Sequence, residues 1–175
     1  MASRCLVILA GWLVVSAIAG TLQAADPPDW SRFRGPNGSG ISSADHVPTE
    51  FGPEKNLLWR IPLPQGHSSP ILLGDRVYLT AFRGDALVTM AIDRHHGRIL
   101  WARSAPEVKT RVIDKRNNAA SPSPAVEENG VYVFFPDNGL IAYDAAGAEQ
   151  WKMPLGPFNN IYGMGASPII VGDNL

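Results

Sequence analysis

Three features are scarce in this chain: cysteine, an excess of charge of either sign and, after the N-terminal segment, long hydrophobic runs. The single cysteine, Cys5, lies near the N-terminus, so we expect a mature protein that is stabilised without disulfides. The formal net charge of −1 indicates no nucleic-acid partner. A sustained helical period is also missing, and short apolar and β-branched runs take its place, which predicts an all-β fold.

Residues 1–24 have the features of a secretory signal peptide. Arg4 precedes an apolar stretch, and small residues offer cleavage after Ala24, with Ala25 as an alternative. Glycine, serine and threonine interrupt the stretch, which favours cleavage over retention as a membrane anchor. No small-residue lipidation box precedes Cys5. We therefore expect a periplasmic or secreted protein with no stable membrane span after cleavage.

The remainder of the chain contains an internal repeat, in which an aspartate, a glycine turn and a tryptophan recur in the same order. The repeated residues are Asp93, Gly97 and Trp101, then Asp144, Gly147 and Trp151. Each unit opens with a Ser-Pro step, at Ser69, Ser123 and Ser167. The spacing from Trp59 to Trp101 is 42 residues and from Trp101 to Trp151 is 50. This period suits a four-stranded β-propeller blade better than a helical pair.

We expect four antiparallel strands in each unit, joined by turns rich in glycine, aspartate and asparagine. In the first unit the strands are predicted at residues 70–73, 76–82, 86–93 and 98–103. In the second unit they are predicted at residues 124–127, 130–135, 139–144 and 149–153. The first strand of each unit is innermost, and the strand that bears the tryptophan is outermost.

The repeats divide the chain into a signal peptide at 1–24, an N-terminal extension at 25–56 and a partial propeller at 57–175. Residues 57–63 match the outer strand but have no inner strands before them, so we interpret them as a closing strand for a blade beyond this sequence. Two blades follow, and then the start of a third. A closed ring of six to eight blades needs about 270 to 380 residues, so we expect an N-terminal fragment of a longer propeller.

The pattern Ala-x-Asp-x-x-x-Gly-x-x-x-Trp at residues 91–101, with the Ser-Pro and Gly-Asp-x-Val-Tyr rhythm, resembles the pyrroloquinoline-quinone-like (PQQ-like) β-propeller repeat. The leader at 29–42 resembles the start of secreted PQQ-like repeat proteins of planctomycete-type bacteria. The resemblance covers residues 29–175. It implies a propeller fold but several functions, because the superfamily contains quinoprotein dehydrogenases and also non-catalytic propellers of the outer-membrane assembly machinery.

Each residue that could act in catalysis or ligand binding also has a purely structural interpretation. We interpret His95 and His96 as solvated turn residues, because no second ligand pair lies nearby in the sequence. Asp93 and Asp144 are predicted to accept hydrogen bonds in Asx turns. We predict inter-blade packing for the repeated tryptophans Trp59, Trp101 and Trp151. The Gly-rich segment 35–40 lacks the strand-to-helix context of a phosphate loop. We therefore assign no catalytic and no metal-binding residue, and the cofactor-binding residues are unknown.

The connection from each outer strand to the next inner strand varies in length, and it defines one face of the predicted propeller. This loop face is expected to hold residues 66–68, 83–85, 107–118, 136–138 and 158–162. Across residues 103–116, at and beside this face, the basic residues Arg103, Lys109, Arg111, Lys115 and Arg116 outnumber the acidic Glu107 and Asp114. An ordinary solvated loop remains the alternative to a binding surface.

Two functions follow from the resemblance. We favour an exported non-catalytic propeller without a cofactor, which binds a protein or envelope-polymer partner through its loop face. The alternative is a quinoprotein dehydrogenase of alcohols or sugars that uses pyrroloquinoline quinone and calcium. The mature chain lacks the adjacent cysteine pair of quinoprotein alcohol dehydrogenases, and no calcium-ligand set or catalytic aspartate is assignable.

Overall fold

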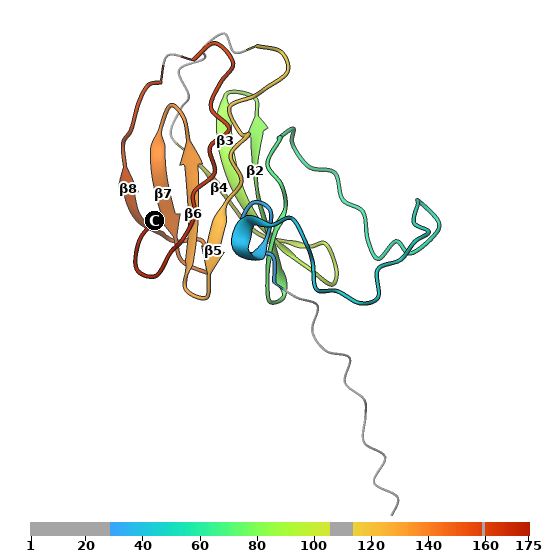
Figure 1. Ribbon diagram of the computed structural model, residues 1–175. Helices are drawn as coiled ribbons and strands as arrows, with labels where there is room; N and C mark the ends of the chain where they lie inside the picture. The colour runs from blue at the N-terminus through green and yellow to red at the C-terminus, as the bar shows by residue number, and fades with distance from the viewer. Residues whose placement is uncertain (1–28, 106–113, 159) are drawn as a thin grey trace, which may run out of the picture.

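Two four-stranded antiparallel sheets form the structure, a computed structural model that describes residues 29–105, 114–158 and 160–175 (Figure 1). Blade 1 contains β1 (Ile71–Leu73), β2 (Arg76–Arg83), β3 (Ala86–Asp93) and β4 (Ile99–Ser104). Blade 2 contains β5 (Ala125–Glu127), β6 (Gly130–Phe135), β7 (Gly139–Tyr143) and β8 (Glu149–Met153). The strand order within each sheet follows the chain. The predicted all-β fold and its four-stranded units are confirmed.

The main hydrophobic core lies between the two blades. Ile71, Leu87 and Trp101 of blade 1 pack in one cluster with residues of blade 2 such as Val133 and Phe135. All five side chains are less than 9% exposed. The burial of apolar area between the sheets is the principal force that holds the blades together. A smaller buried cluster of Ala81, Val88 and Met90 lies within blade 1.

Each blade has the same irregularity before its outer strand. The register shifts between Ala91 and Ile92 in blade 1 and between Ala142 and Tyr143 in blade 2. The shift lies beside the turn that the repeated aspartate organises. A β-bulge of this kind increases the local twist of the strand and changes the direction of the side chains that follow it. The two blades are thus copies of one local structure, as the repeat predicts.

The repeated tryptophans join successive blades. Trp59 Nε1 donates to Arg94 O at 2.7 Å, and Trp101 Nε1 donates to the carbonyl oxygen of Ala145 in the next turn at 3.1 Å. The predicted inter-blade packing is confirmed for Trp101, and Trp59 makes the matching contact with blade 1 from the unpaired segment 57–63. Trp151 is 41% exposed and lies beside Tyr132 of its own blade, with ring centroids 6.0 Å apart.

Residues 57–63 and the start of the third repeat each make local contacts like those found in the two blades. Residues 57–63 have no strand pairing, although Trp59 contacts blade 1 as Trp101 contacts blade 2. Their role as a closing strand stays a prediction. In the third repeat Val171 and Asn174 exchange backbone hydrogen bonds of 2.9 and 3.1 Å around Gly172. That turn matches the one between β1 and β2.

The Ser-Pro steps form a ladder of hydrogen bonds from repeat to repeat. The backbone N–H of Ser69 donates to Ser123 Oγ at 2.8 Å, and the N–H of Ser123 donates to Ser167 Oγ at 3.0 Å. Each hydroxyl therefore accepts the N–H of its counterpart in the preceding repeat. This arrangement explains why serine stands before proline in the second and third units.

The predicted signal peptide at 1–24 lies outside the described residues. Within the described parts of the chain, no helix has both the length and the apolar character to cross a membrane.

Candidate functional site

The long connections between blades gather at one end of the sheets, which is the upper end in Figure 1. They link β4 to β5 and β8 to the third repeat. Because the strands are antiparallel and follow chain order, the short β2–β3 and β6–β7 turns lie at the same end. The described parts of the predicted loop face therefore lie at one end of the molecule.

Direct hydrogen bonds join the two long connections. The N–H of Asp114 donates to Ile161 O at 2.8 Å, and Asn117 Nδ2 donates to Tyr162 O at 2.7 Å. The guanidinium of Arg116 lies over the ring of Tyr162, 5.8 Å from its centroid. A connection of one blade is thus fixed to that of the next, and the loops form a joint surface rather than separate solvated turns.

A carboxylate orients the arginine at the centre of this surface. Arg116 Nε donates to Asp114 Oδ1 at 2.8 Å and Arg116 Nη2 donates to Asp114 Oδ2 at 3.1 Å. Hydrogen bonds from the Arg116 side chain lower the pKa of Asp114, and the same contact raises the pKa of Arg116. Both groups are therefore ionised at neutral pH. The paired geometry holds the guanidinium plane in place beside Tyr162.

Exposed apolar side chains lie in the second long connection, which contacts this arginine through Tyr162. Ile161 is 69% exposed, Tyr162 is 58% exposed and Phe158 is 37% exposed. Phe158 is anchored on Phe134 of β6, with ring centroids 6.0 Å apart. Aromatic residues together with arginine are enriched where proteins bind proteins, because they supply apolar contact area and directed hydrogen bonds.

The structure describes three of the five basic residues counted from Arg103 to Arg116, and one of these three lies off the loop face. Arg103 does not belong to it: Arg103 Nε donates to Gly147 O at 2.6 Å, and its guanidinium lies 6.0 Å from the Trp101 ring centroid. Arg103 therefore joins the blades, from the outer strand in which it was predicted. Lys115 and Arg116 are exposed at the loop face. Glu107, Lys109 and Arg111 lie outside the described residues.

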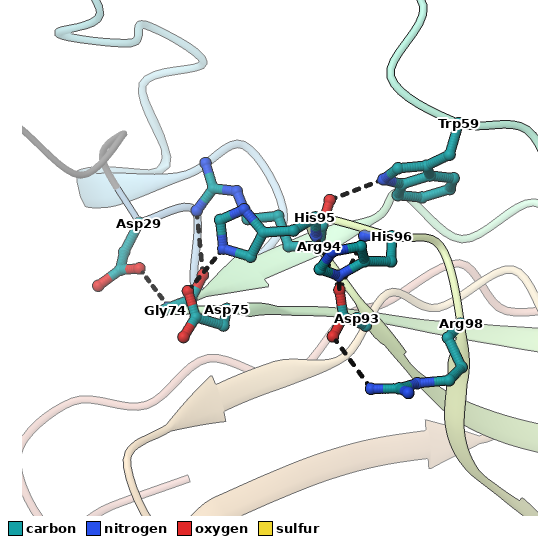
Figure 2. Close-up of polar contacts among 9 residues, drawn as sticks. All are labelled: Asp29, Trp59, Gly74, Asp75, Asp93, Arg94, His95, His96 and Arg98. Atoms are coloured by element: carbon teal, nitrogen blue, oxygen red, sulfur yellow. Dashed lines mark hydrogen bonds and ion pairs between the residues drawn. The ribbon is translucent and has the colours of Figure 1, made fainter. Parts of the chain in front are cut away.

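The opposite end carries the histidine pair (Figure 2). His95 Nε2 lies 2.9 Å from Asp75 Oδ1, and His96 Nδ1 lies 3.0 Å from Asp93 Oδ1. The histidine side chains are 58% and 77% exposed. Both residues occupy the β3–β4 turn and contact different carboxylates. The interpretation as solvated turn residues is confirmed.

Asp93 and Asp144 organise equivalent turns. Asp93 Oδ1 accepts the N–H of His95 at 3.0 Å and that of His96 at 2.8 Å. In blade 2, Asp144 Oδ1 accepts the N–H groups of Ala146 and Ala148 at 2.9 and 2.8 Å. The backbone N–H of His96 is the main cause of a lowered pKa at Asp93. The predicted Asx turns are confirmed.

The inner strands that the structure describes offer few side chains that could hold calcium. β1 and β5 carry aliphatic side chains and one carboxylate, Glu127, which accepts a hydrogen bond from Tyr132 Oη. No group of three or more His, Cys, Asp or Glu residues at 29–105, 114–158 and 160–175 is placed to hold a metal ion. This part of the chain therefore supplies no ligand set for calcium.

Sequence reasoning missed the residues that join the loop face. Asn117 and Tyr162 lie in different connections, and no spacing rule relates them, since the connections are where repeats vary in length. The exposed aromatic at 162 and the Asx-type residues at 114, 117 and 160 were the available signals.

The two repeated sheets, their bulges and the tryptophan contacts between blades define a protein built from PQQ-type β-propeller repeats. Residues 52–174 match the family described as outer membrane protein assembly factor BamB, and the chain belongs to this family. A search of curated proteins found no match.

Proposed function

We infer that this protein is an exported, non-catalytic β-propeller that binds a protein or polymer of the cell envelope through its loop face. The observation that carries the proposal is the bonding of one long connection to the next, by Asp114 to Ile161 and by Asn117 to Tyr162. Ordering loops in advance lowers the entropy lost on binding. The surface that results combines exposed apolar groups with an oriented guanidinium.

The family supports the same kind of function. Its description names an outer membrane protein assembly factor, and we take such an assembly role to be non-enzymatic. For this chain we propose a partner at the periplasmic side of the envelope, reached after removal of the N-terminal segment. No catalytic residue and no cofactor are part of the proposal.

Capture of envelope components by the immobilised protein tests the loop face. We expect a double variant, Lys115→Ala with Arg116→Ala, to reduce capture at least fivefold, and Tyr162→Ala to do the same, because these side chains lie at the joint surface. The matched control removes two positive charges at the opposite end, by Arg94→Ala with Arg98→Ala. Equal capture by all variants would contradict the proposal.

The quinoprotein alternative has its own measurement. Protein supplied with pyrroloquinoline quinone and calcium should show no rise in melting temperature and no reduction of an artificial electron acceptor with alcohols or sugars. Saturable quinone binding with turnover would overturn the binding function in favour of the dehydrogenase.

A further inference from the structure

The segment that precedes the repeats bonds to both blades. Asp29 Oδ1 accepts the N–H of Gly74 at 2.8 Å, a contact visible in Figure 2. Trp30 and Leu72 then exchange two backbone hydrogen bonds, of 2.8 and 2.9 Å. The next residue, Ser31, accepts the N–H of Val126 through its carbonyl oxygen at 2.9 Å. Successive residues of one segment thus reach two different sheets.

The two contacted positions are equivalent. Leu72 and Val126 are the middle residues of the three-residue inner strands β1 and β5. Each inner strand pairs with a neighbour on one side only, β1 with β2 and β5 with β6. The other edge would present unpaired N–H and C=O groups. Trp30 bonds to the free edge of β1 and Ser31 bonds to the free edge of β5, in each case at the middle residue of the strand.

The segment has a fold of its own that holds it in this position. The ring of Trp30 covers Gly35, which is buried and has a φ of 68°. The N–H of Gly35 donates to Arg32 O at 2.9 Å, and the N–H of Gly40 donates to Arg34 O at 2.8 Å. Trp30 also packs against the hydrophobic cluster between the blades. The glycine-rich leader is therefore a folded turn with a side chain in the core.

The same segment continues toward the third repeat. Ser31 and Arg32 face Ile170 across a cavity of about 350 Å³, which Val126 also lines. Ile170 occupies the position that Leu72 and Val126 hold in the first two repeats. Figure 1 shows η1 (Pro36–Gly38), the helical turn of this segment, close to β5 on the inner side of the sheets.

We propose that residues 29–38 are an inner strap, which locks successive blades together through the free edges of their inner strands and covers the inner side of the sheets. The strap uses backbone bonds to positions that repeat from blade to blade, so it does not depend on the side chains of those strands. It also occupies the side of β1 and β5 on which an axial ligand would have to lie. The strap is independent of the loop face, and either proposal can fail without the other.

Amide-resolved hydrogen exchange tests the strap. The amides of Leu72 and Val126 donate to Trp30 and Ser31, so Trp30→Ala should accelerate exchange of both at least tenfold. Gly35→Val should do the same, because a Cβ at Gly35 would lie 2.4 Å from the Trp30 ring and displace it. The amide of Val77 in β2 is the internal reference and should not change, which separates release of the strap from global unfolding.

Phe33→Ala is the matched control, since it removes an aromatic side chain from the same segment that is 48% exposed. It should leave exchange at Leu72 and Val126 unchanged. Trypsin cleavage after Arg32 and Arg34 should rise at least tenfold in Trp30→Ala and Gly35→Val and not in Phe33→Ala. Unchanged exchange of Leu72 and Val126 in both strap variants would overturn the proposal.

Discussion

Ser123 Oγ accepts the backbone N–H of Ser69, its counterpart in the preceding repeat, at a distance of 2.8 Å. Ser123 is only 2% exposed, so water does not replace this acceptor easily. We expect Ser123→Ala to lower the free energy of unfolding by about 1 to 3 kcal/mol, because it leaves a partly buried N–H without its partner. Urea unfolding measures the change. Ser43→Ala, on the exposed N-terminal extension, should have no effect beyond about 0.5 kcal/mol.

Gly147 should not tolerate a side chain. A Cβ there would lie 2.6 Å from the Trp101 ring, and the residue has a φ of 82°. Gly84 also has a positive φ, of 64°, but nothing lies within 4 Å of its Cβ position. Gly84→Ala therefore measures backbone strain alone, about 1 kcal/mol, and Gly147→Ala should cost about 1 to 3 kcal/mol more. Similar losses in thermal unfolding would show that the Trp101 contact is not tightly packed.

Acid should weaken the turn that Asp93 organises. Its pKa is lowered in the folded protein, chiefly by the His96 N–H, relative to an ordinary value of about 3.9 in the unfolded chain. The carboxylate therefore stabilises the fold fully above about pH 4, and this contribution is lost as the pH falls through the lowered folded pKa. Asp93→Asn should be less stable than the wild type at pH 6.

The difference in stability between the two proteins should shrink as the pH falls through the lowered folded pKa of Asp93, because protonation then removes the charge from this position. Denaturant titrations at pH 6, 5, 4 and 3 measure the difference, with the exposed substitution Asp45→Asn as the control. A stability difference that stays constant across this range would mean that hydrogen-bond geometry, and not ionisation, sets the contribution of Asp93.

The contact between the long connections predicts how the loop face responds to a single change. Asn117→Ala removes the 2.7 Å hydrogen bond to Tyr162 O. We expect faster hydrogen exchange across residues 160–163, with unchanged exchange in β6, because the bond orders a loop and not the sheet. Asn118→Ala is the matched control, since Asn118 Oδ1 accepts the N–H of Ala120 within its own connection. Equal effects of the two variants would argue against a joint surface.

The strands were predictable because their signals are local. Alternating apolar runs and glycine turns place β2 and β6 within a residue of the predicted bounds, and the Asx turns follow from one aspartate before each glycine. The direction in which the Arg103 side chain points could not be predicted from such local signals. Its side chain contacts the neighbouring blade at Gly147, and the relative placement of blades is not encoded in any one window of sequence.

The serine ladder and the inner strap escaped sequence reasoning for related reasons. The sequence shows the repeated serines Ser69, Ser123 and Ser167, but it does not show that they bond to one another. Their hydrogen bonds join a backbone N–H to a hydroxyl about 44 to 54 residues away. Trp30 lies in a segment with no repeat and no strand period, so its antiparallel bridge to Leu72 had no local signal. Both features depend on three-dimensional register between repeats.

The bonds that join the long connections end on the main chain, at Ile161 O and Tyr162 O. Because a carbonyl oxygen is supplied by every amino acid, substitutions at these two positions leave the acceptors in place. The side chains at 161 and 162 can therefore change while these two hydrogen bonds remain, although a change at 162 removes the ring that Arg116 covers. Such a surface can be altered for a new partner one residue at a time, without a new framework to support it.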